Sequence, residues 1–338
     1  MTSDPKCIVV IGASSGGINA LQELVSYLTP AFDAAFFVVM HLSRSGMGDF
    51  MQYRLQPHTA LKCIVGNEGM PVQRGCIYLA PVNKHLLVKE GRIIIGHGAP
   101  ENRWRPSIDV LFRSAAASYG SSVIGIVLTG YLSDGTAGMN AIRKCGGITM
   151  VQDPNEAEVP DMPLSVLENM DVNYCVPLGQ IGRTLQGVID SFVPANSIIP
   201  PEIIREAEIA EKVATGIDVV RTVAEGSVYA CPDCGGVLWE VKDDNICRFR
   251  CNIGHAYSEA ELHVKQAESV DATLWMAVRI MEERKNLLIK LEADYERRGL
   301  LNMASTYRQK HTEITTHIDK LKEILFDVEN YAVTRLPA

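Results

Sequence analysis

The hydrophobic pattern of the chain begins with a strand, a tight turn and a helix. Residues 7–11 form an unbroken apolar run, which is typical of a strand buried on both faces of a sheet. Residues 12–17, with the sequence GASSGG, predict a turn, and residues 18–28 place apolar side chains three and four positions apart, as in a helix. In an open α/β sheet, functional groups gather in such turns, at the carboxyl ends of the strands.

Further apolar runs predict the rest of a sheet. Residues 34–42 predict a second buried strand that ends on a histidine, and residues 123–129 predict a later one. From there strands and helices alternate up to residue 192. This alternation predicts an α/β fold with a doubly wound, mostly parallel, Rossmann-like sheet for residues 1–193, which we assign as one domain.

Four short apolar runs lie between these segments, at residues 61–65, 76–80, 85–88 and 92–95. The last three are separated by only a few residues each. Parallel strands need longer connections, so we expect these runs to form an antiparallel meander beside the parallel sheet.

The pattern changes beyond residue 193. Residues 194–225 predict a Pro-containing linker with a charged helix, and residues 226–257 carry a cluster of cysteines. In residues 258–338 apolar side chains recur at alternating spacings of three and four, with a break at 294–299. This pattern predicts a helical hairpin or a coiled coil, whose apolar seam serves self-association or a signalling partner.

Charge and composition exclude several classes of protein. The 338 residues carry a formal net charge of −8 and no dominant basic patch, so nucleic acid is not an expected partner. No apolar run reaches the ~18 residues of a membrane span, and the first strand follows the start of the chain without a signal peptide. We therefore expect a cytoplasmic protein with no membrane insertion, whose crowded cysteines favour a metal over disulfides.

The turn at residues 12–17 suits either phosphate binding or attack by a serine. It lacks the dinucleotide fingerprint G-x-G-x-x-G, and the Gly-Lys-Ser/Thr of a P-loop is also missing. The second strand ends on His41 instead of the acidic residue that binds a ribose. Nucleotide binding is therefore disfavoured, and no catalytic cofactor is expected.

Three side chains suit nucleophilic catalysis. Ser14, His41 and Asp134 each follow the end of a predicted strand. In a parallel sheet these ends lie on one edge, so a serine nucleophile, a histidine base and an orienting carboxylate can converge there. The alternative is structural: Ser14 and Ser15 cap the first helix, His41 fills a loop and Asp134 begins a helix.

A second group of residues has the spacing of metal ligands. Cys231 and Cys234 form a C-x₂-C pair, and Cys251 and His255 follow as C-x₃-H. This is the pattern of a tetrahedral structural zinc site, so we expect a zinc-ribbon-like module that depends on the metal for its fold. Cys247 is a rival for the fourth ligand, and a ribbon without metal is the alternative.

Six motifs in order carry a family resemblance: IGASSGG (11–17), MHL (40–42), YLAPVNKH (78–85), NRWRPSIDVLF (102–112), LTGYLSDGTAGM (128–139) and PDMP (160–163). Together they closely resemble the catalytic domain of the bacterial chemotaxis receptor methylesterases, the CheB family. The resemblance covers about residues 6–192 and implies that residues 1–193 are the methylesterase catalytic domain. It implies a hydrolase that removes methyl groups from glutamate methyl esters of chemoreceptors and releases methanol; some members also deamidate receptor glutamines.

The resemblance also implies roles and a substrate. It makes Ser14 the nucleophile, His41 the base and Asp134 the residue that orients the base, with a methylated chemoreceptor as the partner. The chemistry suits backbone N–H groups that hold an oxyanion after Ser14 and near Gly130 and Tyr131.

Two positions depart from the family pattern, since Tyr131 commonly is Met and Trp104 often is His. Arg103 and Arg105 are expected to be solvated charges or to bind a substrate carboxylate. Many members begin with a phospho-receiver domain, but here the first catalytic strand starts at Cys7, so we expect the stand-alone form. The alternative function is a catalytically idle adaptor of a signalling pathway that works through the helical tail.

Overall fold

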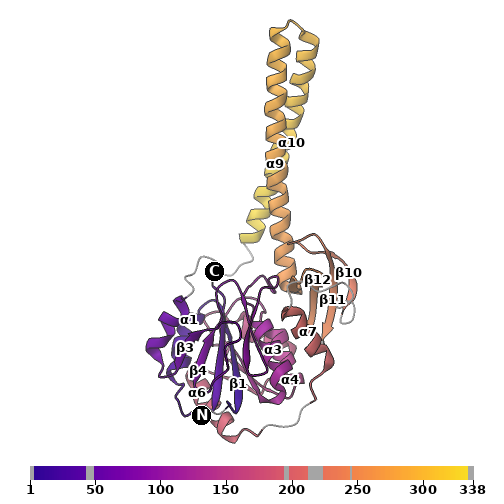
Figure 1. Ribbon diagram of the computed structural model, residues 1–338. Helices are drawn as coiled ribbons and strands as arrows, with labels where there is room; N and C mark the ends of the chain where they lie inside the picture. The colour runs from indigo at the N-terminus through magenta and orange to yellow at the C-terminus, as the bar shows by residue number, and fades with distance from the viewer. Residues whose placement is uncertain (1–3, 43–48, 194–197, 212–223, 244–245, 334–338) are drawn as a thin grey trace. The chain divides into compact units, whose positions relative to one another are not determined.

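A computed structural model describes residues 4–42, 49–193, 198–211, 224–243 and 246–333 (Figure 1). It divides into two compact units, residues 1–262 and residues 263–338, and each is described by itself. Much of the predicted linker, at residues 194–197 and 212–223, lies outside the described residues, as does the side chain of Val328 in the predicted seam. The four-part division of the chain stays a prediction.

The centre of the first unit is a seven-stranded sheet with the order β3-β4-β2-β1-β7-β8-β9, and every neighbouring pair of strands is parallel. The predicted parallel, Rossmann-like α/β sheet is therefore confirmed. Its strands are β1 (Cys7–Ala13), β2 (Ala34–Met40), β3 (Lys62–Val65), β4 (Cys76–Leu79), β7 (Val123–Val127), β8 (Ile148–Gln152) and β9 (Tyr174–Val176).

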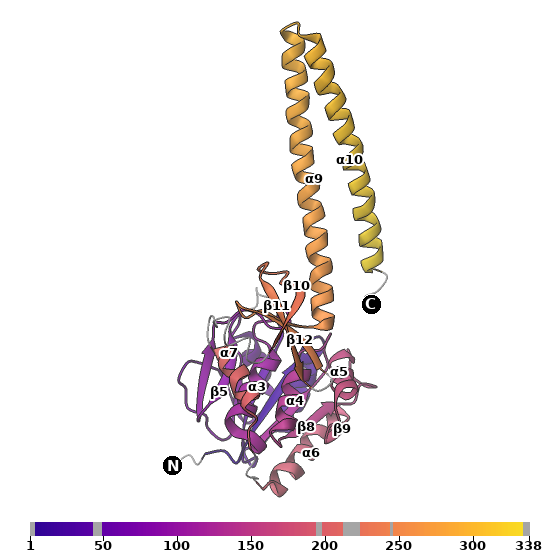
Figure 2. The same cartoon turned by 90° about the vertical axis from the view of Figure 1, so that its right-hand side faces the viewer.

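Helices cover both faces of this sheet. Side chains of α1 and α6 pack on one face, and those of α3, α4, α5 and α7 pack on the other, which Figure 2 shows with α3 and α4 in front. All seven residues of β1 are buried, because the strand has apolar neighbours on both faces. The helices are α1 (Gly17–Ser26), α2 (Phe50–Leu55), α3 (Ile108–Tyr119), α4 (Thr136–Lys144), α5 (Asp161–Asn169), α6 (Leu178–Ser191) and α7 (Pro201–Glu211), with 3₁₀ turns at Gln56–His58 and Gly120–Ser122.

The expected antiparallel meander is only partly right. β5 (His85–Lys89) and β6 (Arg92–Gly96) do form an antiparallel hairpin, but β4 joins the main sheet as a parallel strand between β2 and β3. The connection from β3 to β4 needs no helix, because its backbone is held by β6: the N–H of Ile93 donates to Met70 and that of Val72 to Gly91, both at 2.9 Å.

The cysteine-rich segment forms a separate sheet, here called the β-module. It is antiparallel with the order β10 (Glu225–Ala230), β11 (Val237–Asp243), β12 (Ile246–Cys251) and β13 (Ala256–Ser258). Its interior is small and consists of Cys231, Leu238, Phe249, Cys251, Tyr257 and Leu262. So small a core supplies little stability by burial alone.

Buried ion pairs join the β-module to the loop before α3 and to α7. Arg250 donates to Glu101 at 2.7 Å, and Arg248 donates to both carboxylate oxygens of Glu206 at 2.9 and 3.0 Å. Arg113 of α3 pairs with both carboxylates from the other side. Burial alone would raise the pKa of Glu206, but the charges of Arg248 and Arg113 lower it to about 2. Removing one partner of such a buried pair leaves an uncompensated charge, which costs about 3–5 kcal/mol.

The second unit contains most of a helical hairpin, made of α9 (Glu259–Arg297) and α10 (Leu301–Val333) (Figure 1). The break predicted at residues 294–299 is confirmed only at its end: α9 continues to Arg297, and Gly299 in the turn has a φ of 72°, the left-handed conformation that glycine adopts freely. Leu288, Ile314 and Ile318 form its buried seam. Among the described helices, none combines the length and the apolar character that crossing a membrane requires.

Candidate active site

The structure brings Ser14, His41 and Asp134 together at one edge of the main sheet. β1 lies between β2 and β7, so the segments that follow these three strands are neighbours. Nδ1 of His41 lies 3.2 Å from Oγ of Ser14, and Nε2 of His41 lies 2.8 Å from Oδ2 of Asp134. All three side chains are buried, with exposed fractions of 7%, 6% and 2% in that order. This continuous chain of hydrogen bonds is the arrangement that activates a serine.

The turn after β1 presents Ser14 without using it as a helix cap. The cap position of α1 is Gly16, whose φ of 74° is left-handed, and no side chain caps the helix. The backbone N–H of Ser14 donates to Thr129 at 3.0 Å, which fixes the turn against the end of β7. Gly130 is next to it, and a Cβ there would lie 2.6 Å from the Cβ of Ser14, so a side chain at this position would displace the serine.

Asp134 is held by hydrogen bonds from the segment of residues 102–108, which leads into α3. Asn102 and the hydroxyl of Ser107 each donate to its Oδ1 at 2.9 Å, and the N–H of Ile108 donates to its Oδ2 at 2.7 Å. Burial alone would raise the pKa of this carboxyl, but the hydrogen bond and charge of His41, with the bonds from Asn102 and Ile108, lower it below its usual range. Asp134 is therefore ionised and fixed in direction at neutral pH.

A second carboxylate, Asp109, lies beside Asp134. Its Oδ1 accepts the N–H groups of Gly135 at 3.1 Å and Gly138 at 2.6 Å, so it fixes the start of α4 directly after Asp134. Burial and the charge of Asp134 raise the pKa of Asp109 to about 6. Asn102 donates to both carboxylates at once, at 2.8 Å to Asp109, and so bridges two like charges.

The imidazole of His41 is also fixed by stacking. The ring of Trp104 lies parallel to it, with 4.3 Å between the ring centres and 8° between the planes. This contact covers one face of the imidazole while its two nitrogens face Ser14 and Asp134. A hollow of about 500 Å³ opens over these groups, and its lining includes Tyr131 as well as Trp104. A small side chain of a substrate fits a hollow of this size.

Of the two arginines near the site, Arg103 and Arg105, the second is held by hydrogen bonds and is not a simple solvated charge. Arg105 donates to the carbonyl of Gly98 at 2.8 Å and to Oδ1 of Asn83 at 2.9 and 3.0 Å, so it fixes the loop before α3. Arg103 has a φ of 71°, in the left-handed region. Substrate binding by either residue stays a prediction.

Three supporting residues, Asn102, Ser107 and Asp109, received no role in the sequence-based analysis. All three lie in the motif NRWRPSIDVLF at residues 102–112, which is polar at its start and leads directly into α3. A polar cluster before a helix is typical of a site that orients backbone donors. The carboxylate that this cluster binds is Asp134, which follows β7 and comes later in the chain. The motif alone therefore does not identify its partner.

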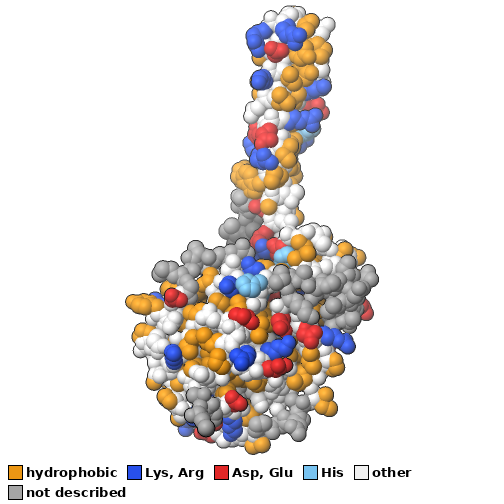
Figure 3. Space-filling view, in the orientation of Figure 1, with side chains coloured by type: hydrophobic (Ala, Val, Ile, Leu, Met, Phe, Trp, Pro, Cys, Tyr) orange, Lys and Arg blue, Asp and Glu red, His pale blue; other side chains and the backbone are white. Residues whose placement is uncertain are grey.

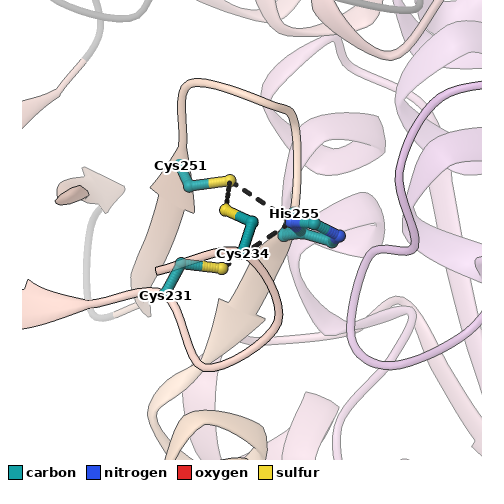
Figure 4. A group of neighbouring side chains, drawn as sticks. All are labelled: Cys231, Cys234, Cys251 and His255. Atoms are coloured by element: carbon teal, nitrogen blue, oxygen red, sulfur yellow. Dashed lines mark hydrogen bonds between the residues drawn. The ribbon is translucent and has the colours of Figure 1, made fainter. Parts of the chain in front are cut away.

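The predicted metal ligands also lie together. The ligand atoms of Cys231, Cys234, Cys251 and His255 are all within 4.8 Å of one another (Figure 4). Sγ of Cys234 and Sγ of Cys251 are 3.6 Å apart, and Nδ1 of His255 is 3.4 Å from Sγ of Cys251. Bonds of ~2.3 Å to sulfur around one tetrahedral ion require such separations, so the four residues fit zinc. Cys247 is not one of these four clustered residues, and its Sγ lies 3.6 Å from the Glu240 carboxylate.

Comparisons with known proteins identify the family of the chain. The profile of the CheB methylesterase family matches residues 9–185. A Leptospira interrogans protein, provisionally named protein-glutamate methylesterase/protein-glutamine glutaminase, is 36% identical over 176 residues, which are 52% of this chain and 91% of the relative. The protein-glutamate methylesterase FrzG of Myxococcus xanthus is 34% identical over 187 residues, which are 55% of this chain and 56% of the relative.

A solved structure gives the same result for the fold. The CheB methylesterase catalytic domain of Thermotoga maritima is 31% identical and superimposes with a TM-score of 0.52, over 54% of this chain and 98% of that domain. The parallel sheet and the motif-bearing turns thus define a carboxylic ester hydrolase fold. The chain belongs to the CheB methylesterase family.

The geometry at Ser14 predicts selective chemical modification. A fluorophosphonate reagent, which reacts with serines that have a base beside them, should label the protein at Ser14. Ser14→Ala should abolish labelling and change the free energy of unfolding by less than about 1 kcal/mol, because it removes a single hydrogen bond. The matched control Ser15→Ala should still be labelled. Mass spectrometry locates the label, and modification of Ser15 in the Ser14→Ala protein would contradict the assignment.

Proposed function

We propose that this protein is a protein-glutamate methylesterase that hydrolyses glutamate methyl esters of chemoreceptors and releases methanol. The observation that carries the proposal is the unbroken chain of hydrogen bonds from Ser14 through His41 to Asp134, in the family fold. The names of the Leptospira and Myxococcus relatives support the class of substrate. The cytoplasm is the proposed location, because the methylated segments of chemoreceptors would be reached there.

The bonds around His41 support an order of events. Nε2–H of His41 donates to Asp134, so the lone pair of Nδ1 faces the hydroxyl of Ser14. Oγ of Ser14 attacks the ester carbonyl carbon as His41 takes its proton. The tetrahedral intermediate then expels the methoxy group, to which the imidazolium returns the proton, and methanol leaves. Water, deprotonated by His41, attacks the acyl carbon. The second tetrahedral intermediate expels Oγ of Ser14, to which the imidazolium returns the proton, and the glutamate carboxylic acid leaves and ionises.

The oxyanion of the intermediate needs backbone donors. One predicted donor is occupied, since the N–H of Gly130 donates to Val159 at 3.0 Å. The N–H groups of Tyr131 and Ser15, on the two turns that meet at Ser14, are the proposed donors, and the side chain of Tyr131 is irrelevant to this role. A glutamine amide passes through the same tetrahedral geometry with ammonia as the leaving group, so receptor glutamine deamidation is a proposed second reaction.

The first prediction for this function concerns Asp134. Asp134→Asn should lower kcat for methanol release from methylated receptor by about 10⁴-fold with little change in KM, since the wrong tautomer of His41 then faces Ser14. Ser15→Ala is the control and should stay active. A folded wild-type protein that releases no methanol would favour the idle adaptor instead.

We also propose that Cys231, Cys234, Cys251 and His255 hold a structural zinc ion. Their mutual distances support this proposal, and so does the scarcity of apolar side chains in the β-module. The ion would supply folding free energy and no catalytic step.

Metal analysis tests the zinc site. Protein purified without chelator should contain roughly one zinc per chain. Cys231→Ser should lose it and melt the β-module first, whereas the matched control Cys247→Ser, a cysteine of the same module outside the cluster, should keep it. A zinc content near zero in the wild-type protein would refute the site.

We propose self-association as the role of the helical hairpin. On α9 the side chains of Met276, Ile280 and Leu287 are more than half exposed and fall within about 40° of arc around the helix. Figure 3 shows apolar side chains exposed between charged ones along this hairpin. The stripe supports contact with a second copy, because two helices alone bury few of their apolar positions.

Light scattering of full-length protein tests this association. The wild type should be a dimer, and the double variant Ile280→Glu, Leu287→Glu should be a monomer, because charges disrupt an apolar seam. Ile289→Glu, an exposed position about 180° around the helix from Ile280, is the control and should stay dimeric. A monomeric wild type would exclude self-association.

A further inference from the structure

The first turn of α9 resembles a capping box, but only one of the two hydrogen bonds of such a box is formed. Oγ of Ser258 accepts the N–H of Glu261 at 3.3 Å, as in an ordinary box. In such a box the glutamate returns to the N–H of the capping serine. Here that N–H donates instead to Oδ1 of Asn102 at 3.2 Å, and Glu261 accepts the N–H and hydroxyl of Ser133 at 3.2 and 3.0 Å. The start of α9 is therefore hydrogen-bonded to two segments of the catalytic domain, one at Asn102 and one at Ser133.

These two segments flank Asp134. Ser133 directly precedes it in the chain, and Asn102 donates to it from the other side. The bond from Ser258 also decides the orientation of the Asn102 amide. Because the amide oxygen is occupied by Ser258, the amide nitrogen faces Asp134 and Asp109.

The β-module holds the rest of the same loop. The N–H of Asn102 donates to the carbonyl of Ala256 at 2.7 Å, and Glu101 accepts Arg250, with both side chains 3% exposed or less. Asn102 and Arg103 have φ values of 49° and 71°. Two consecutive left-handed residues other than glycine cost about 1 kcal/mol each or more and persist only where contacts impose them. Trp104, the next residue, stacks on His41.

We propose that the β-module and the start of α9 act as a clamp that positions the catalytic groups. In this role Asn102 is a positioning residue for Asp134, and the clamp fixes Trp104 against His41. The proposal rests on the proposed esterase function and concerns how the active geometry is maintained. Residues that make the clamp adjoin the proposed zinc ligands, since Arg250 precedes Cys251 and Ala256 follows His255. A metal ion bound by these ligands would therefore fold the turn that carries Arg250 and Ala256, the two residues that contact the loop at Glu101 and Asn102.

The clamp is tested in the full-length protein with Arg250→Met, which leaves Glu101 paired with Arg113. We expect kcat to fall at least about tenfold with KM changed less than about threefold, because orientation is lost and binding is not. The matched control is Asp243→Asn, since Asp243 of β11 bonds to Asn140 and Lys144 of α4 but not to the loop. The control should keep kcat within about twofold of the wild type. Equal losses in both variants would overturn the clamp.

Hydrogen exchange gives a readout that does not depend on activity. In Arg250→Met the peptide that contains residues 101–105 should exchange at least about tenfold faster, while peptides of β1 stay protected. This outcome is measurable even if the wild type hydrolyses no methyl ester, so failure of the esterase proposal and failure of the clamp are distinguishable. Unchanged exchange in the loop would refute the clamp.

Asn102→Ala tests the positioning role itself. Without this donor the carboxylate of Asp134 loses a hydrogen bond that fixes its direction toward His41. We expect kcat to fall at least about tenfold with KM changed less than about threefold, because orientation is lost and binding is not. Asn102→Asp should not restore kcat, because it adds a third carboxylate to the cluster. A kcat within about twofold of the wild type in Asn102→Ala would contradict the positioning role.

Discussion

The structure of the active site depends on keeping one buried carboxylate ionised. Taking a carboxylate out of water costs several kcal/mol even after relaxation, and hydrogen bonds must offset this cost. Asp134 obtains them from His41, from Asn102, and from Ser107 and Ile108 at the start of α3. Since these donors lie on different segments, the ends of the strands, the loop before α3 and the histidine are fixed together. The reactive geometry at Ser14 follows from this arrangement.

Local patterns in the sequence predict well the elements that bring Ser14, His41 and Asp134 together. The strand, turn and helix of residues 7–28 follow from an apolar run, small residues and helical spacing, which are neighbours in sequence. The predicted antiparallel pairing of residues 76–79 was wrong, because contacts with a part of the chain distant in sequence decide how this strand pairs. Their parallel pairing depends on a connection whose backbone bonds to β6, a strand that follows later in the chain. Short connections suggest antiparallel pairing only when nothing else holds them.

The long-range contacts that hold the loop at Glu101 and Asn102 in place were not predictable from the sequence. Arg250 and Glu101 are separated by 149 residues, and Ser258 and Asn102 by 156. Arginine and glutamate are mostly exposed in proteins, so nothing in the sequence marks this pair as buried. The zinc-type spacing at Cys231–His255 indicates a module and says nothing of the surface on which that module lies. Long-range charge pairing of this kind becomes visible only in three dimensions.

The buried ion pairs have an electrostatic consequence for the proposed reaction. Four buried carboxylates lie near three buried guanidinium groups, which leaves one negative charge in excess: Glu101, Asp109, Asp134 and Glu206 against Arg113, Arg248 and Arg250. Glu261, whose pKa is raised to about 7 by burial and by Asp134, adds to this excess as it ionises. When His41 takes the proton of Ser14, positive charge develops on the imidazole and negative charge on the substrate oxygen, so the net charge of the site stays the same. The excess negative charge lies on the side of Asp134, where it stabilises the imidazolium, and the oxyanion forms on the other side of His41, where backbone donors are proposed.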